Sequence, residues 1–155
     1  MTVQEFLLIV SGKPEGKDRP RFNHKTGRTY TTKKTTLAES EIRRAWEDLG
    51  QPRFERGVPL RIDVVMVVTR PQGHFKKDGS LSAQGLRMPY PTTRKPDADN
   101  CLKLCMDSLN SRAYHDDVQI VSAHVDRIWG ENPETRIKVR ELPNLKELVD
   151  EGNKG

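Results

Sequence analysis

The chain has 155 residues, enough for one domain with a hydrophobic core but too few for two ordinary domains. Lysine and arginine number 27 against 22 aspartates and glutamates, and this positive balance favours a polyanionic partner such as nucleic acid. Aromatic residues make up only 6% of the chain, so base stacking on an aromatic platform is not the expected binding mode. Because the sequence has no long apolar run and no leader-like N-terminus, we expect a soluble, cytoplasmic protein that does not associate with membranes.

The first half of the chain alternates apolar segments with turn residues. Residues 3–10 are rich in branched apolar side chains and predict a strand. The basic stretch 17–32, punctuated by glycine and proline, predicts a loop or an irregular hairpin. Apolar side chains at helical spacing predict a helix from about 32 to 49. The long apolar run at 59–71 predicts a buried strand in the centre of a sheet.

The second half predicts one more helix and two more strands. Residues 72–96 are dominated by glycine, proline, serine and lysine, which predicts a functional or disordered loop. A helix is expected over 97–109, followed by strands at 118–129 and 134–142. The charged tail 143–155 is expected to be frayed or to form a short peripheral helix. Together these elements predict a single α+β domain, with a small mixed sheet, two main helices and the order β-α-β-α-β-β.

The stretch KPDADNCLKLCMDSLNSRAYHDD, which runs from Lys95 to Asp117, gathers five aspartates around the second predicted helix. Crowded carboxylates are costly unless something positive holds them together. Asp97 and Asp99 stand at the helix start, where one acid is most simply explained as a cap for free backbone N–H groups. Capping does not easily explain two alternating acids followed by Asn100.

One face of the predicted helix carries Asp99, Lys103 and Asp107, spaced four residues apart. The structural interpretation of this face is a solvated ladder of ion pairs, each worth about 0.2–0.5 kcal/mol. In the functional interpretation, the short turn after the helix brings Asp116 and Asp117 back to the other acids at one edge of the sheet. Because adjacent strand residues point to opposite faces, at most one of this pair should join that group.

Hard oxygen ligands gathered at one point suit Mg²⁺ or Mn²⁺, and such an ion would relieve the carboxylate repulsion. With Lys103 nearby and a basic chain, the chemistry indicated is phosphodiester hydrolysis. One alternative is an Asp-x-Asp phosphotransferase, although such a motif normally follows an apolar strand and here follows TTRKP. A second alternative is a non-catalytic DNA-binding module whose acids serve as caps and salt bridges, although no helix-turn-helix, zinc or RNA-binding pattern supports it.

The segment 95–121 closely resembles the core of the RusA-type Holliday-junction resolvases, crossover junction endodeoxyribonucleases that are often carried by prophages. The family pattern is an Asp-x-Asp-Asn, a lysine four residues after the second aspartate, a helix ending in Asp-x-Leu, and an Asp-Asp-x-Gln-(Ile/Val)-Val. All of these elements stand in this chain, as Asp97, Asp99, Asn100, Lys103, Asp107–Leu109, Asp116–Asp117 and Gln119. The early segments GKPEGKDRPRF and TYTT also resemble the corresponding segments of proteins in this family.

The resemblance implies a RusA-like endonuclease domain over residues 1–142, followed by the charged tail 143–155. It further implies a homodimer that resolves branched DNA, the four-way junction, by paired symmetric nicks during DNA recombination and repair. Mg²⁺ would be the cofactor, and Mn²⁺ would also support activity. The metal-binding and catalytic carboxylates would be Asp97, Asp99 and Asp117, with Lys103 as a catalytic lysine.

Basic residues outside this core are candidates for contacts with DNA phosphates, although a solvated surface explains them equally well. Arg94 and Lys95 are the stronger pair because they adjoin the acids, and the early basic run adds Arg19 and Arg21.

Overall fold

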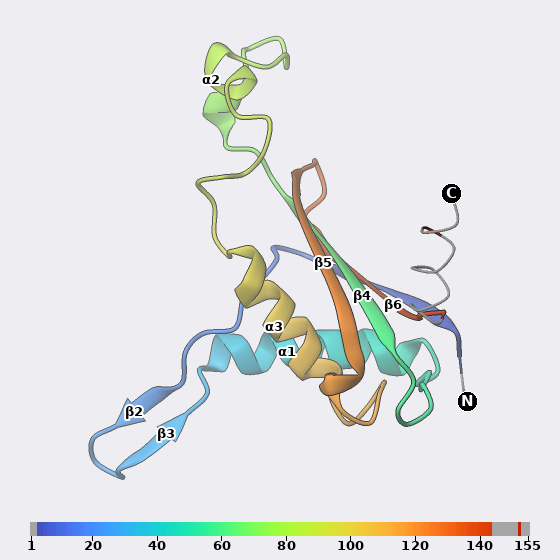
Figure 1. Cartoon of the computed structure of the whole chain (residues 1–155). Helices are drawn as coiled ribbons and strands as arrows, with labels where there is room; N and C mark the ends of the chain where they lie inside the picture. The colour runs from blue at the N-terminus through green and yellow to red at the C-terminus, as the bar shows by residue number, and fades with distance from the viewer. Residues whose placement is uncertain (1–2, 144–151, 153–155) are drawn as a thin grey trace.

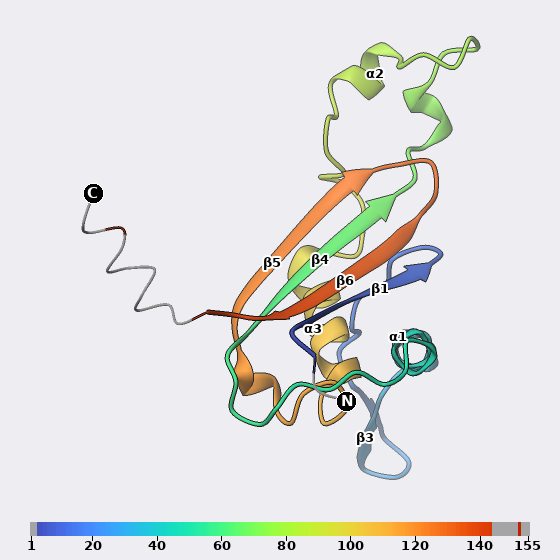
Figure 2. The same ribbon diagram turned by 90° about the vertical axis from the view of Figure 1, so that its right-hand side faces the viewer.

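The computed structural model describes residues 3–143 and 152, and it places both main helices on one face of a four-stranded sheet (Figure 1, Figure 2). The elements in chain order are β1 (Glu5–Ser11), β2 (Arg21–Asn23), β3 (Arg28–Tyr30), α1 (Lys33–Asp48), β4 (Leu60–Val68), η1 (Gln72–His74), α2 (Ala83–Leu86), α3 (Ala98–Leu109), η2 (Asp117–Gln119), β5 (Ile120–Trp129) and β6 (Glu134–Glu141). The α+β class, the single domain, the mixed sheet and the two main helices are confirmed.

The sheet has the strand order β1-β6-β4-β5, so the long apolar strand β4 lies between two neighbours, as expected. It pairs antiparallel with β6 and parallel with β5. The parallel pairing requires a crossover from the end of β4 to the start of β5, and the chain makes it through α2 and α3. The candidate acids therefore belong to this crossover connection.

The core lies between the sheet and the two helices (Figure 2). From α1, Ile42 and Trp46 are buried, and the indole Nε1 of Trp46 donates to the Pro52 carbonyl at 2.8 Å. From α3, Leu104 and Leu109 are buried, together with both cysteines of the chain. Burying each large apolar side chain contributes about 1.5–3 kcal/mol. This packing fixes the orientation of α3, so that its opposite face is turned to solvent.

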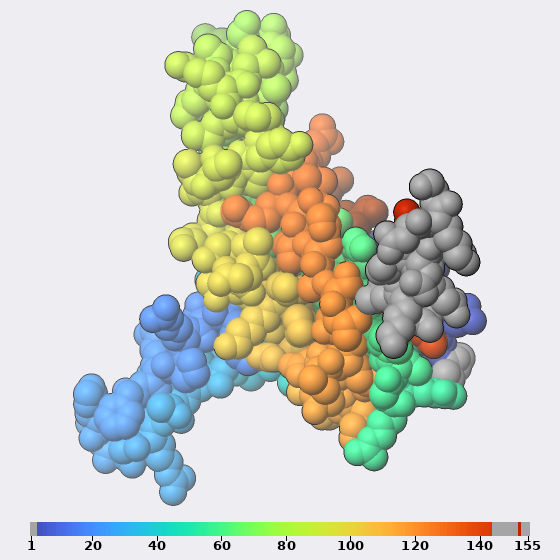
Figure 3. Space-filling model, in the orientation of Figure 1, coloured from blue at the N-terminus to red at the C-terminus, as the bar shows by residue number. Residues whose placement is uncertain are grey.

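Two segments project from this body (Figure 1, Figure 3). The hairpin of β2 and β3 confirms the predicted irregular hairpin, and its base is tied to α1 because the Thr32 hydroxyl donates to Asp18 at 2.9 Å. At the end of β4, residues 72–90 extend past the sheet and contain η1 and α2. The expected loop at 72–96 is therefore partly helical.

No helix among the described residues is long and apolar enough to cross a membrane. The expectation for the tail 143–155 lies outside the described residues, apart from positions 143 and 152.

Candidate active site

At the N-terminal end of α3, Asp97 occupies the cap position, but its carboxylate makes no capping bond to any described backbone N–H. Instead, one of its oxygens accepts a hydrogen bond from the Asn100 side-chain amide at 2.6 Å. That bond is the main reason why the pKa of Asp97 is lowered, and the charge of Lys95 and a contact with Asp99 add to it. The simplest interpretation of Asp97, as a helix cap, therefore does not describe its side chain.

The loop before β2 packs directly on this end of the helix. The backbone N–H of Lys17 donates to the Asn100 carbonyl at 3.0 Å. A Cβ on Gly16 would lie 2.8 Å from the Pro96 Cβ, so a residue with a side chain does not fit without movement. The loop and the helix start enclose a hollow of about 300 Å³ beside Asp97. Its walls carry several basic side chains, namely Lys13, Lys17, Lys34 and Lys95.

The face of α3 that carries Asp99 and Lys103 is exposed, but the ladder of ion pairs that the structural interpretation requires does not form along it. Asp107 pairs with Lys17, which also lies 3.8 Å from a carboxylate oxygen of Glu39. Among the described residues, Lys103 makes no ion pair, so its ammonium group is available to a ligand.

At the C-terminal end of α3, Asp117 lies close to other carboxylates. Its backbone N–H donates to the Asn110 side chain at 3.1 Å, which holds it beside the helix end. Desolvation by partial burial raises the pKa of Asp117, and the neighbouring carboxylates of Asp116 and Asp107 raise it further. Tyr114 is buried next to this group, and its hydroxyl donates to the Met106 carbonyl at 2.5 Å. Lys17 pairs with Asp107, so among the described residues the carboxylates left without an ion pair at this end of the helix are Asp116 and Asp117.

Asp116 and Asp117 differ, but not for the reason expected from the sequence. The strand was predicted from 118, whereas β5 begins at Ile120 and is preceded by η2. Alternation along a strand therefore does not apply. Asp116 is the cap of η2, because its carboxylate accepts from the Val118 N–H at 3.1 Å. Its own N–H donates to the Gln119 side chain at 3.2 Å, which completes a capping box. Capping occupies Asp116, and Asp117 makes no such bond within the described chain.

The two acidic groups were expected to meet at one edge of the sheet, and within one chain that expectation is wrong. Asp97 precedes α3, whereas Asn110, which binds the backbone of Asp117, follows it. At about 1.5 Å of rise per residue, the helix separates the two ends by roughly 20 Å. Accordingly, no three His, Cys, Asp or Glu side chains among the described residues are grouped to hold a metal ion. Each end offers hard carboxylate oxygens of the kind Mg²⁺ prefers, but only as part of a ligand set.

The candidate DNA-binding residues lie in two places. Arg19 and Arg21 are exposed at the base of the hairpin, in a stretch from Arg19 to Lys34 that holds six lysines and arginines and no acid. Arg94 and Lys95 are exposed between residues 72–90 and the start of α3.

Two features near these residues have no counterpart among the patterns of the sequence. Lys17 had no assigned role, and only the folded chain brings it to Asp107. Trp129 is only partly buried, and the guanidinium of Arg70 lies 5.2 Å from its ring centre. No local pattern predicts these pairings because the partners are far apart in the sequence.

Comparison with known proteins shows which family has this sequence. The family described as endodeoxyribonuclease RusA matches residues 11–140, which include the hairpin, all of α3 and the acids at both of its ends. The chain belongs to the RusA endodeoxyribonuclease family. It is also 30% identical over 141 residues to the uncharacterized protein YqaN of Bacillus subtilis (strain 168), a similarity that covers 87% of this chain and 95% of the relative. Membership of the RusA family indicates endodeoxyribonuclease activity.

Proposed function

We propose that this protein is a divalent-metal-dependent endonuclease that resolves four-way DNA junctions by paired symmetric nicks, in DNA recombination and repair. The observation that carries the proposal is the family match over 11–140, which spans the acids and the free lysine of α3. Residues 1–142 would form the endonuclease domain and 143–155 a tail, acting in the cytoplasm. Mg²⁺ would be the natural ion, with Mn²⁺ as a substitute.

In this proposal, Asp97, Asp99 and Asp117 hold the metal. A bound divalent ion supplies Lewis-acid stabilisation of the phosphate charge and activates water. The chain contributes the rest. The hydrogen bond from Asn100 and the charge of Lys95 keep Asp97 ionised, and thus able to bind a cation without first losing a proton. Lys103, which is exposed, would neutralise charge on the phosphate as it develops during hydrolysis.

The basic hairpin would hold the DNA. A two-stranded ribbon fits the major groove, and the exposed Arg19 and Arg21 stand where that ribbon leaves the body of the protein. Arg94 and Lys95 lie between the acids and residues 72–90, close enough to the site for contacts with phosphates near the cleaved bond. These contacts should make binding weaken steeply with salt.

The separation of the acids along α3 supports the proposal of a homodimer. In a two-fold dimer with antiparallel α3 helices, the acids at the start of one helix would lie near those at the end of the other. Each of the two sites would then combine Asp97 and Asp99 of one chain with an acid from the partner. Two such sites related by a two-fold axis fit a reaction that needs two symmetric nicks.

Mixing two inactive variants tests this arrangement. Asp97→Asn and Asp117→Asn proteins, each inactive alone, are unfolded and refolded together to form mixed dimers. If each site draws on both chains, a mixed dimer keeps one intact site and nicks the junction once. If each site lies within one chain, mixing restores no cleavage, and the shared-site arrangement is wrong.

The central experiment incubates the protein with a synthetic four-way junction in Mg²⁺, and in parallel with linear duplex of the same sequence. We expect paired nicks in the junction, no cleavage in EDTA, and a dimer by sedimentation. Full activity in EDTA would remove the metal mechanism. Binding without cleavage under all conditions would leave the non-catalytic DNA-binding module as the function.

A further inference from the structure

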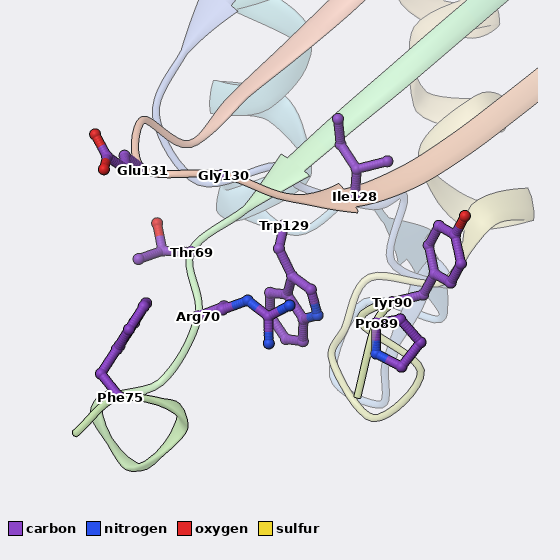
Figure 4. A pocket seen from close by; sticks show the side chains of 9 residues that line it. All are labelled: Thr69, Arg70, Phe75, Pro89, Tyr90, Ile128, Trp129, Gly130 and Glu131. Atoms are coloured by element: carbon purple, nitrogen blue, oxygen red, sulfur yellow. The ribbon is translucent and has the colours of Figure 1, made fainter. Parts of the chain in front are cut away.

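A hollow of about 710 Å³ opens beyond the ends of β4 and β5, between the sheet and residues 72–90 (Figure 4). Phe75 and Tyr90 stand on opposite sides of it, with Trp129 and Arg70 between them (Figure 4). Three of the nine aromatic residues of the chain therefore line one hollow, although aromatic residues are scarce overall. None of these side chains has a part in the proposed cleavage reaction.

The floor of this aromatic hollow is held rigidly. The Arg70 guanidinium lies 5.2 Å from the centre of the Trp129 ring, and the Trp129 indole N–H donates to the Met88 carbonyl at 3.0 Å. Arg70 also donates to the carbonyls of Gly85, at 3.0 Å, and Met88, at 3.2 Å. The buried His74 meets Trp129 edge to face at 5.4 Å. A surface fixed in this way loses little freedom when a ligand stacks on it.

The walls of the aromatic hollow, in contrast, are open to solvent. Phe75 is 44% exposed and Tyr90 is 60% exposed, which is unusual for side chains with so much apolar area. The polar groups at the rim are few, chiefly Thr69 and Glu131. A ligand with a flat π-face would fill the hollow with little need for specific hydrogen bonds.

The aromatic hollow is connected to the candidate active site through basic side chains. Thr69 also borders a second hollow, of about 500 Å³, which Arg94 and Lys95 line. Lys95 in turn borders the hollow beside Asp97. The path from the acids to the aromatic hollow therefore passes lysine and arginine, as the backbone of a nucleic acid strand requires.

We propose that the aromatic hollow holds an unpaired nucleobase of the DNA substrate beside the point of cleavage. This inference rests on the proposed action on branched DNA, and it names the feature of that DNA which is recognised. Paired bases in a continuous duplex hide their faces in the stack, whereas a base at a branch point, gap or end can enter. The hollow would thus favour branched or frayed DNA over plain duplex.

Binding measurements in EDTA test the inference without any cleavage. The two DNAs are a duplex with a short thymidine overhang and a blunt duplex of the same sequence. We expect Phe75→Ala and Tyr90→Ala to weaken binding to the overhang DNA about tenfold, and binding to the blunt duplex by less than about twofold. Leu86→Ala is the matched control, because Leu86 is 68% exposed on α2 but does not line the hollow. An equal loss on both DNAs, or no loss on either, would overturn the inference.

Photo-crosslinking then locates the base. An overhang that carries 5-iodouracil should crosslink to the peptides that contain Phe75, Tyr90 or Trp129, and crosslinks confined to other peptides would contradict the proposal. Sedimentation of Tyr90→Ala gives an independent check, since a shift from dimer to monomer would assign the hollow to a subunit contact instead. Neither assay requires metal or cleavage. If the protein prefers overhang DNA but never cleaves a four-way junction, the proposed base site stands and the proposed resolvase function is wrong.

Discussion

The two ends of α3 carry the same residue type in opposite electrostatic situations. At the start, Asp97 accepts a hydrogen bond from Asn100 and lies near Lys95, and its pKa is lowered. At the other end, partial burial and the carboxylates of Asp116 and Asp107 raise the pKa of Asp117. The start of the helix stabilises the charge of Asp97, whereas at the end Lys17 pairs with Asp107 and the charge of Asp117 is left beside other carboxylates. A cation can stabilise an acid that lies beside other carboxylates, so under the proposed metal mechanism we expect Asp117 to depend more on the ion than Asp97 does.

The largest effect should come from charge removal within the adjacent pair at the end of the helix. We expect Asp117→Asn to reduce junction cleavage by more than about 100-fold. Mutating a residue that only hydrogen-bonds to a metal ligand commonly lowers metal affinity or activity by about 10- to 100-fold, and a metal ligand itself should matter more. Asp116→Asn should cost much less, because asparagine caps a helix as well as aspartate does. The assay is cleavage of a four-way junction over a range of Mn²⁺ concentrations. Equal losses from both variants would show that capping does not separate the two roles.

A second test concerns the face of α3 between the two ends. Lys103→Ala should reduce cleavage by about 100-fold, the usual cost of removing one group that stabilises transition-state charge. Junction binding in EDTA should hardly change, since one lysine among many adds little to phosphate affinity. Unchanged cleavage would reduce Lys103 to a solvated surface residue.

At the start of the helix, Gly16→Ala should disturb the environment of Asp97 without changing any charge. The new Cβ would meet the Pro96 Cβ at 2.8 Å and the Asn100 Cβ at 3.1 Å, so the loop or the helix start must shift. We expect a loss of about 1–3 kcal/mol in stability, which is typical of overpacking, and lower cleavage activity. Thermal unfolding and junction cleavage measure the two effects. Gly73→Ala is the control, because its new Cβ would meet only the flexible Gln84 side chain, at 3.4 Å.

The smallest effect is on stability, and its sign follows from the raised pKa of Asp117. The folded protein binds this proton more tightly than the unfolded chain, so unfolding free energy falls as pH rises from the ordinary carboxyl pKa through the raised one. At pH 7 and without metal, Asp117→Asn should therefore unfold at a slightly higher temperature, by no more than about 3 °C. The difference should vanish at low pH, where both forms are neutral. Added Mg²⁺ should raise the Tm of the wild type more than that of the variant.

Much of the fold and part of the site could be predicted because they depend on local patterns. The apolar run of β4 and the helical spacing in α3 decide which residues face the core, whatever surrounds them. The separation of Asp97 from Asp117 was also implicit in the sequence, since a helix of that length spans about 20 Å. The expectation that the two acidic groups meet did not take the length of this helix into account.

The class of the fold and the order of the main elements could be predicted from the sequence by itself, and so could the place of the candidate acids and of Lys103 on or beside α3. Periodicity and motif are properties of neighbouring residues, so they do not depend on how the chain packs. Only the structure decided that Asp116 caps η2 and that Asp117 is left beside other carboxylates. The reason is that β5 begins at Ile120, two residues later than predicted, and η2 precedes it. The structure also decided that Lys17 pairs with Asp107, and that Phe75, Tyr90 and Trp129 meet in one hollow. These contacts join residues far apart in the chain, and their free energy exists only once the sheet and the crossover have packed.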